Sequence, residues 1–246
     1  MDNIGYLAIS RAALLQRATE VAANNIANAN TDGFRGTEAV FESMVVDTGS
    51  GSQMRQMAYA VDRGTFADLS EGALYRTSNP LDVAMVGEGW FGFMTQTGQT
   101  ALGRAGNFSM SAQGDLVTAS GDFVLDEGGA PINIPPGAGD VEIDGTGLIT
   151  DARGDQIARI GTFQAQDIGN WTQLGGAMFT PRDGVVELVP VLEPEMAQGF
   201  VERSNVNPIM EMTKMISLQR QYESAMNLAN LSDDLRKQTL SRLAPK

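Results

Sequence analysis

Residues 204–243 read SNVNPIMEMTKMISLQRQYESAMNLANLSDDLRKQTLSRL, and no glycine or proline follows Pro208 within them. Because these two residues most disfavour a helix interior, the run predicts one long helix. Its expected start has Asn207 as N-cap, Pro208 at the first helical position and Glu211 in the first turn. At about 1.5 Å per residue the helix exceeds roughly 45 Å, too long for a small globular body to cover its apolar face. We therefore expect it to pack against another long helix.

Apolar residues recur along this segment at helical spacing, which predicts an amphipathic face. They are Met212, Met215, Leu218, Tyr222, Met226, Ala229, Leu231 and Leu235. The N-terminal segment 1–30 shows the same period. Its apolar positions are Ile4, Leu7, Leu14, Ala18, Val21 and Ile26. This run stops at NANTDGF, residues 28–34, where the asparagines and Gly33 end a helix.

The glycines separate these ends from the middle of the chain. Of 28 glycines, only Gly5 precedes Gly33 and none follows Gly199. Between them lie short apolar or alternating runs, separated by pairs such as Gly-Asp and Asp-Gly at spacings of roughly 8–12 residues. We therefore expect an α+β fold: a glycine-rich antiparallel β domain, sandwich or partly open barrel, over 81–204. Residues 31–80 are expected to be an extended connector or loose hairpin. The ends, 1–30 plus 205–246, are expected to pair as a coiled-coil-like helical domain.

Composition excludes several classes of function. The 246 residues contain no cysteine and no histidine, which removes thiol catalysis, Cys- or His-based metal sites and Ser-His-Asp triads. The net charge of −13 disfavours nucleic acid and anionic membranes as partners. We expect no catalytic residues, no metal, no cofactor and no small-molecule substrate. No basic segment precedes an apolar one near the N-terminus, so a cleaved secretory signal peptide is not expected either.

Three motifs suggest chemistry but have simpler explanations. Gly87, Gly89 and Gly92 match a dinucleotide-binding pattern, but no helical period follows, so a turn between strands is preferred. Asp47-Thr48-Gly49 matches half of an aspartic-protease pair without a second copy, and it is interpreted as a loop. The remaining candidates are carboxylate pairs, interpreted as solvated surface. They are Asp126/Glu127, Asp151/Asp155 and Glu193/Glu195.

Four stretches, in order along the chain, resemble the flagellar basal-body rod and hook family of bacteria. They are AANNIANANTDGFR (22–35), LDVAMVGEGWFGF (81–93), RAGNFSMSAQGDLVTASGDFVLD (104–126) and VERSNVNPIMEMTKMISLQRQYE (201–223). The Met-Asp start, the short length and GGAPINIPPG at 128–137 favour the proximal-rod type, with distal-rod and hook types as alternatives.

The resemblance implies a structural subunit whose terminal helices polymerise into the axial tube of the rod and transmit torque, with the β domain facing outward. Its implied partners are copies of itself, other rod subunits and the flagellar type III export apparatus. Its implied location is the periplasmic part of the rod, reached without a cleaved signal. We expect the helical ends to be poorly ordered before assembly, because isolated helices lack packing.

The apolar stripes and the family signature together define the residues expected at subunit interfaces. They are Leu7, Leu14, Val21, Asn25, Asn28, Met212, Met215, Tyr222, Met226 and Leu235. Gly33, Phe34 and Arg35 are expected to turn the chain from the helix into the connector, with Gly33 at positive φ.

Two functions from other classes stay open. The first is a glycan-binding β module with helical ends, for which Trp90 and Trp171 would be stacking platforms. The second is a cell-wall hydrolase that uses paired carboxylates.

Overall fold

The computed structural model describes residues 2–48, 55–139, 141–182 and 186–243, and the chain divides into two compact units. Unit 1 comprises Met1–Ala27, Thr37–Phe66 and Asn207–Lys246, and unit 2 comprises Asn28–Gly36 and Ala67–Val206. Two long terminal helices and antiparallel sheets confirm the expected α+β class.

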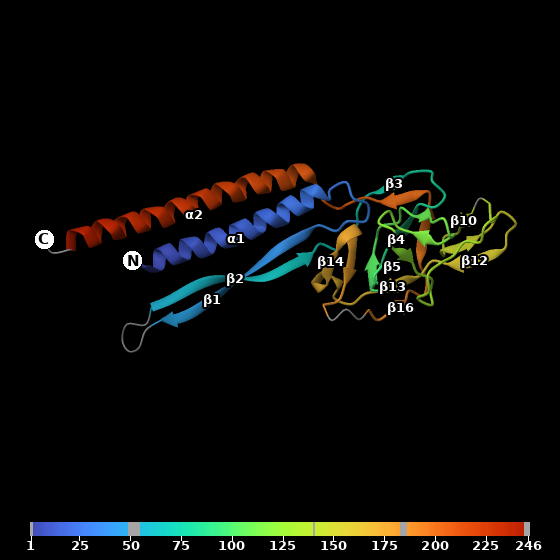
Figure 1. Cartoon of the computed structure of the whole chain (residues 1–246), viewed down its shortest axis with the longest axis horizontal. Helices are drawn as coiled ribbons and strands as arrows, with labels where there is room; N and C mark the ends of the chain where they lie inside the picture. Colours follow the sequence, from blue (N-terminus) through green and yellow to red (C-terminus); the bar gives the residue numbers. More distant parts are fainter. Residues whose placement is uncertain (1, 49–54, 140, 183–185, 244–246) are drawn as a thin grey trace. The chain divides into compact units, whose positions relative to one another are not determined.

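The two helices of unit 1 are α1 (Asp2–Ala27) and α2 (Pro208–Leu243). They lie side by side and antiparallel, so that the start of α1 and the end of α2 are at the same end of the pair (Figure 1). The long helix against which α2 packs is therefore the N-terminal helix of the same chain.

The start of α2 is capped as expected. Asn207 Oδ1 accepts hydrogen bonds from the backbone N–H groups of Ile209 and Met210, at 3.1 and 3.3 Å. These are two of the N–H groups that a helix start leaves without an intrahelical partner. At the other helix, α1 ends before the asparagine cluster, and the N–H of Thr31 donates to the carbonyl of Asn28 at 3.0 Å to close a turn.

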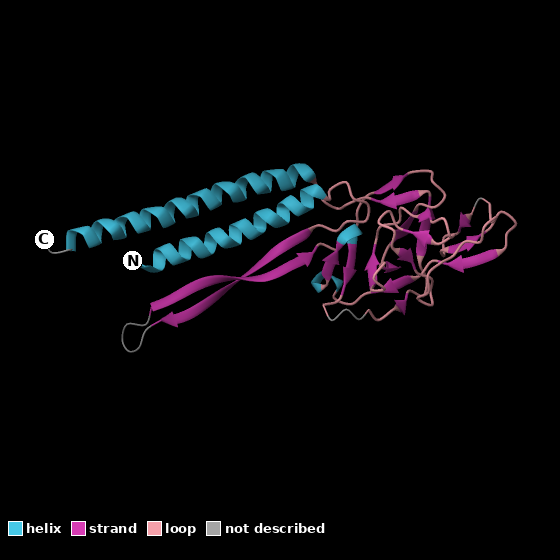
Figure 2. Cartoon of the chain, viewed as in Figure 1, coloured by secondary structure: helices cyan, strands magenta, loops and turns pink. Residues whose placement is uncertain are grey.

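A paired β ribbon completes unit 1. It consists of β1 (Thr37–Thr48) and β2 (Arg55–Ala67), drawn as two long strands in Figure 2. The sequence suggested only a loose hairpin or connector here, because the strand pattern is interrupted by charges. Asp47 and Thr48 belong to β1, which corrects their interpretation as loop residues, and Gly49 lies outside the described residues.

Unit 2 is built from short strands joined by tight turns. They are β3 (Leu74–Arg76), β4 (Val83–Val86), β5 (Trp90–Met94), β6 (Thr100–Gly103), β7 (Ser109–Met110), β8 (Leu116–Val117), β9 (Phe123–Val124), β10 (Glu142–Ile143), β11 (Leu148–Thr150), β12 (Gln156–Arg159), β13 (Thr162–Gln164), β14 (Thr172–Leu174), β15 (Met178–Thr180), β16 (Val189–Pro190), β17 (Glu195–Gln198) and β18 (Phe200–Glu202). Two 3-10 turns, η1 (Ile168–Asn170) and η2 (Gly175–Ala177), flank β14.

The strands of unit 2 pair in antiparallel fashion. The largest sheet has the order β14-β15-β6-β5-β9-β8-β7, and β13 pairs with both β5 and β16. A second sheet has the order β10-β11-β12, and two further pairs are β17-β4 and β18-β3. None of the sheets that the described strands form closes into a barrel.

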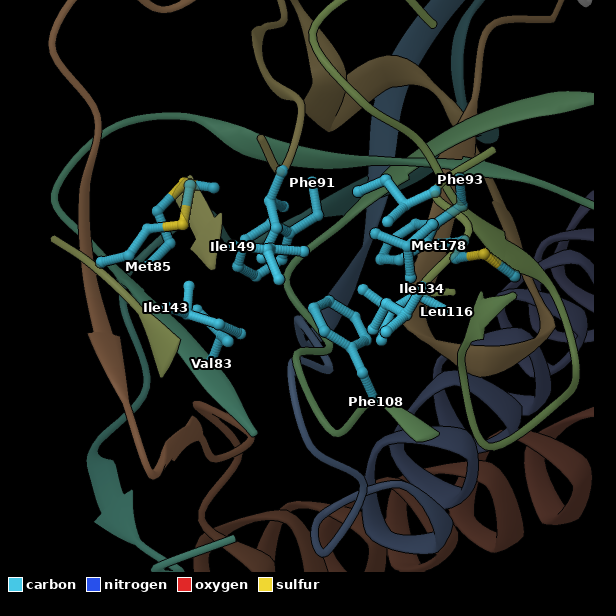
Figure 3. Packing of buried hydrophobic residues seen from close by; sticks show 14 of the residues in the cluster. Val83, Met85, Phe91, Phe93, Phe108, Leu116, Ile134, Ile143, Ile149 and Met178 are labelled. Carbon is cyan, nitrogen blue, oxygen red and sulfur yellow. The ribbon is translucent and has the colours of Figure 1, made fainter. Parts of the chain in front are cut away.

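The core of unit 2 is aromatic and aliphatic. Phe91 and Phe93 on β5 are fully buried, and Phe108 meets both rings edge-on at centroid distances of 5.5 and 6.3 Å. Figure 3 shows these rings gathered with Leu116, Met178 and neighbouring aliphatic side chains. Edge-to-face rings add directional attraction to the burial of apolar area.

One turn design recurs six times in unit 2. A Ser, Thr or Asp opens each turn, its side-chain oxygen accepts the backbone N–H four residues on, and a glycine with φ between 80° and 91° stands at the fourth position. The opening residues are Thr95, Ser111, Thr118, Asp126, Asp144 and Asp151. A left-handed residue there suits a three-residue hairpin loop, so these turns set the strand register.

Candidate assembly surface

The α1–α2 seam consists mainly of small side chains. Ala8, Ala12 and Ala22 of α1 and Ala225 of α2 are buried. A Cβ placed on Gly5 would lie 3.7 Å from Ser232 Oγ, so the helices approach closely at this end. Alanine lines the seam and buries little apolar surface per residue. The large apolar side chains of both helices therefore remain to a great extent outside it.

Large apolar side chains are exposed on both helices. Ile209, Met210 and Tyr6 keep 75%, 69% and 68% of their surface accessible. The others with about half of their surface exposed are Ile9, Met212, Ile216, Leu228, Leu231 and Leu235. Contiguous exposed apolar surface is typical of interaction sites.

Two hollows run along the helix pair. One, of about 370 Å³, has walls from Tyr6, Ile9 and Met226, with Asp233 and Arg236 also lining it. The other, of about 430 Å³, is lined by residues that include Ala8, Arg11, Ala225, Leu228 and Leu231. Both hollows are lined by residues of α1 and of α2.

The structure distributes the residues expected at interfaces over three environments. Met212 and Leu235 are exposed. Five more are half-buried: Leu7, Leu14, Met215, Tyr222 and Met226. Val21 and Asn25 are buried within unit 1, so in this structure their side chains are not available to a neighbouring subunit.

Asn25 has a clear role inside its own unit. Its Nδ2 donates to the carbonyl of Thr37 and its Oδ1 accepts the N–H of Thr37, both at 2.9 Å. The amide thus binds the first residue of β1 as a neighbouring strand would, and it joins α1 to the ribbon. Asn28, in unit 2, accepts a hydrogen bond on Oδ1 from Thr31 Oγ1 at 3.2 Å.

The sequence analysis did not identify all of the large apolar side chains that are exposed on α1 and α2. The residues Tyr6, Ile9, Ile209, Ile216 and Leu228 were not among those expected at interfaces. Their signal was present as three- and four-residue steps, as in Ile209, Met212 and Ile216. It was obscured because α2 carries apolar residues on more than one face, and only packing shows which face α1 covers.

Ion pairs connect the ribbon to both helices. Arg17 Nε lies 3.7 Å from Asp62 Oδ2 of β2, and Lys214 Nζ lies 3.8 Å from Glu38 Oε1 of β1. These side chains are substantially exposed, so each pair is worth only about 0–1 kcal/mol. They orient the ribbon more than they stabilise it.

In unit 2 the expected connector residues form a buried cluster. Arg35 Nη2 lies 2.7 Å from Glu202 Oε1, and Arg104 Nη1 lies 3.4 Å from Glu202 Oε2. Arg104 Nη2 also donates to the carbonyl of Gly87 at 2.6 Å, and the N–H of Gly72 donates to Glu202 at 2.8 Å. Burial lowers the pKa of the Arg104 guanidinium; the nearby Glu202 carboxylate opposes this shift and the charge of Arg35 adds to it.

The residues before this cluster behave as expected. Gly33 has φ 69°, and a Cβ there would lie 2.2 Å from the backbone nitrogen of Ala105. The N–H of Gly33 donates to the carbonyl of Glu202 at 2.7 Å, and Phe34 is buried. The prediction of a positive φ at Gly33 is confirmed.

The candidate chemical motifs have structural roles. Gly87 and Gly89 lie in the turn between β4 and β5, and Gly92 lies in β5, as preferred over cofactor binding. Asp126 and Asp151 cap their own turns, which accounts for two of the three carboxylate pairs. Within the described ranges, no three carboxylates group as metal ligands would. The described helices are too short or too polar to cross a membrane.

These features define a class of protein first: a subunit whose terminal helices expose apolar surface for assembly. Comparison with known families agrees with this class. Residues 6–35 match the family described as "Flagella basal body rod protein", residues 84–151 match "Flagellar hook protein FlgE/F/G D1 domain", and residues 197–243 match "Flagellar basal body rod FlgEFG protein C-terminal".

Curated relatives extend the match over nearly the whole chain. "Flagellar basal-body rod protein FlgF" of Mesorhizobium japonicum is 36% identical over 229 residues, 93% of this chain and 92% of the relative. The protein with the same name from Caulobacter vibrioides is 31% identical, over 99% of this chain and 98% of its own. "Flagellar basal-body rod protein FlgG" of Agrobacterium fabrum is 32% identical, over 89% of this chain and 91% of the relative.

The chain therefore belongs to the flagellar basal-body rod protein family, and it is FlgF-like. The expected resemblance is confirmed, and membership places the chain among structural, non-enzymatic proteins.

Proposed function

We propose that this chain is a proximal-rod subunit that polymerises through the exposed apolar surfaces of α1 and α2. The observation that supports this most directly is the set of nine large apolar side chains left accessible on the helix pair. Burying a large apolar side chain contributes about 1.5–3 kcal/mol, so half-burying this set contributes on the order of 10 kcal/mol. That is comparable with the cost of association, roughly 4–15 kcal/mol.

The proposed interface differs from the set predicted from sequence. It keeps Leu7, Leu14, Met212, Met215, Tyr222, Met226 and Leu235, and it adds the exposed residues Tyr6, Ile9, Ile209, Met210, Ile216, Leu228 and Leu231. Val21 and Asn25 are assigned instead to the inside of the subunit, because they are buried there. Asn28 lies outside the helices and is proposed as part of the connector with Gly33, Phe34 and Arg35.

The remaining parts of the proposal rest on the family. The subunit would assemble with copies of itself and with other rod proteins, and it would transmit torque through them. It would reach the periplasmic rod through the flagellar type III export apparatus without a cleaved signal, with no nucleic-acid partner. The helical ends would pair as a coiled-coil-like axial domain, and residues 81–204 would face outward. Distal-rod and hook types are the alternatives within the family.

Ile216→Asp tests the assembly surface. Ile216 is half exposed, so a charge there leaves the folded subunit intact but must be desolvated in an interface. We expect loss of incorporation into rods in a strain lacking the native protein, and loss of swimming. The matched control is Gln219→Asp, which adds the same charge at an exposed polar position. Normal incorporation of Ile216→Asp would remove this surface from the proposed interface.

A further inference from the structure

Unit 2 contains two cavities that share one wall. The first, of about 540 Å³, is lined by residues that include Glu71, Glu88, Trp90 and Arg104. The second, of about 280 Å³, is lined by residues that include Trp171 and Glu187. The segment Gln164–Gln166 lines both. Each volume is in or near the range of small-molecule sites, and together the cavities offer room for a ligand of several rings.

We propose that these two cavities form one binding site for a neutral oligosaccharide. No step of assembly as proposed above uses them. The ligand class follows from the side chains. They combine aromatic surface with acidic, basic and uncharged hydrogen-bonding groups.

Four polar side chains that line the first cavity are exposed and lack a hydrogen-bond partner among the described residues. The side chains of Glu71, Glu88, Gln164 and Gln166 make no hydrogen bond or ion pair within the described part of the chain, apart from an electrostatic attraction between Glu71 and Arg104. Carboxylates accept hydrogen bonds, and amides both donate and accept. A ligand rich in hydroxyl groups, which do both, can satisfy all of them.

Arg104 adds a buried donor to the first cavity. Its side chain is 4% exposed, and its Nε has no hydrogen-bond partner. The guanidinium is otherwise engaged by Glu202 and by the carbonyl of Gly87, which holds the turn carrying Glu88 in place. An unsatisfied buried donor is costly unless an oxygen atom or water reaches it.

Charge argues for a neutral ligand. Glu71, Glu88 and Glu187 would repel an anion, and the chain as a whole carries −13. A cation beside Trp90 would meet the charges of Arg35 and Arg104, whose guanidinium carbons lie 5.8 and 5.2 Å from the centre of that ring. A neutral polyhydroxylated molecule avoids both penalties.

The two tryptophans contribute in different ways. Trp90 is 7% exposed and covered by these guanidinium groups, so it is not the stacking platform that the sequence suggested. Trp171 is half-buried and presents part of its surface to the second cavity, where a sugar ring could pack against it.

The shared wall is held rigidly. Gln164 ends β13, whose neighbour Phe163 pairs with Trp90 of β5 on one side and with Pro190 of β16 on the other. After Gln166, Asp167 has φ 53° and its carbonyl accepts the N–H of Asn170 at 2.8 Å. Hydrogen bonds therefore hold the backbone on both sides of the shared segment, which lowers the cost of ordering it on binding.

Titration of the full-length protein with chitotetraose tests the proposal. The chain has two tryptophans, one at each cavity, so tryptophan fluorescence and the two indole N–H signals in NMR spectra report on both. We expect a saturable change in both indole signals. Removing one hydrogen-bonding group by Gln164→Ala or Glu88→Ala should weaken binding by about tenfold.

Controls make each outcome decisive. Gln113→Ala removes an exposed glutamine in a distant turn of unit 2 and should leave binding unchanged, and thermal unfolding should be the same for all variants. Absence of a saturable response, or equal binding by Gln164→Ala and the native protein, would overturn the proposal. So would a salt-sensitive response of the same indole signals to pentalysine, because it would assign the cavities to a cationic partner.

Discussion

The carboxylate of Glu202 lies 2.7 Å from the guanidinium of Arg35, and both side chains are about 1% exposed. The two residues are far apart in the chain but close to its junctions: Arg35 stands two residues before β1, and Glu202 six before α2. Asn205 strengthens the same region of unit 2, because its side chain binds Gly36 and Ser70. This cluster holds together the segments of unit 2 from which the chain leaves for unit 1.

Glu202→Gln should destabilise unit 2 strongly. The substitution leaves two buried guanidinium groups without a counter-charge, and breaking a buried pair by removing one partner costs about 3–5 kcal/mol. Urea unfolding followed by tryptophan fluorescence measures this, since both tryptophans are in unit 2. The control is Glu127→Gln, which breaks an exposed pair with Arg159 and should cost less than about 1 kcal/mol. If the two variants lost the same free energy of unfolding, the buried cluster would contribute no more to stability than an exposed ion pair.

Gly33→Ala should be far more harmful than Gly154→Ala. Both glycines have positive φ, at 69° and 87°, so both substitutions carry a backbone penalty of roughly 1–3 kcal/mol. At Gly33 the new Cβ would also meet the backbone of Ala105 at 2.2 Å, whereas at Gly154 it would meet nothing within 4 Å. Comparing the free energies of unfolding of the two variants isolates the steric part. A Gly33→Ala variant as stable as Gly154→Ala would contradict the close approach.

Ala22→Leu should loosen unit 1, whereas Ala23→Leu should not. Ala22 is 1% exposed, whereas Ala23 is exposed. The two variants therefore place the same larger side chain at a buried position and at an exposed position. Overpacking costs about 1–3 kcal/mol, while surface changes stay within about 0.5 kcal/mol. Thermal melting of the helical circular dichroism signal at 222 nm distinguishes them. Similar melting of both variants would show that α1 is not packed as the structure has it.

The turn opened by Asp151 should weaken in acid. The N–H of Asp155 donates to the Asp151 carboxylate at 2.9 Å; together with the N–H and charge of Arg153 it outweighs desolvation and lowers the pKa of Asp151 below its ordinary 3.8. A carboxylate with a lowered pKa stabilises the fold above its ordinary pKa, and the contribution is lost as the pH falls through the folded value.

NMR titration of the Asp151 carboxyl measures this pKa, and amide exchange in β11 and β12 reports the loosening. Asp151→Asn keeps an acceptor oxygen but cannot titrate, so it should retain the turn and lose its dependence on pH. A pKa at or above 3.8 in the native protein would refute the prediction.

Local patterns determined much of this fold. The N-cap at Asn207, the absence of glycine from the long helix and the positive φ at Gly33 depend on neighbours in the chain, so they could be predicted. The hairpin turns were partly visible as Gly-Asp and Asp-Gly pairs. The capping of these turns by Asp126 and Asp151 was not predicted. The sequence pattern of two nearby acidic residues is the same whether a carboxylate accepts backbone N–H groups or faces water.

The sequence by itself determined that both ends of the chain are helices with apolar faces and that the middle is a set of short hairpins, since helix period, caps and turn residues act over a few positions. Only the tertiary structure decided which faces remain open. Ala8 and Ala22 pack inward while Ile216 and Leu231 do not, because burial depends on what another part of the chain brings alongside. The same holds for Arg35, Arg104 and Glu202, whose charges meet only after unit 2 has folded around them.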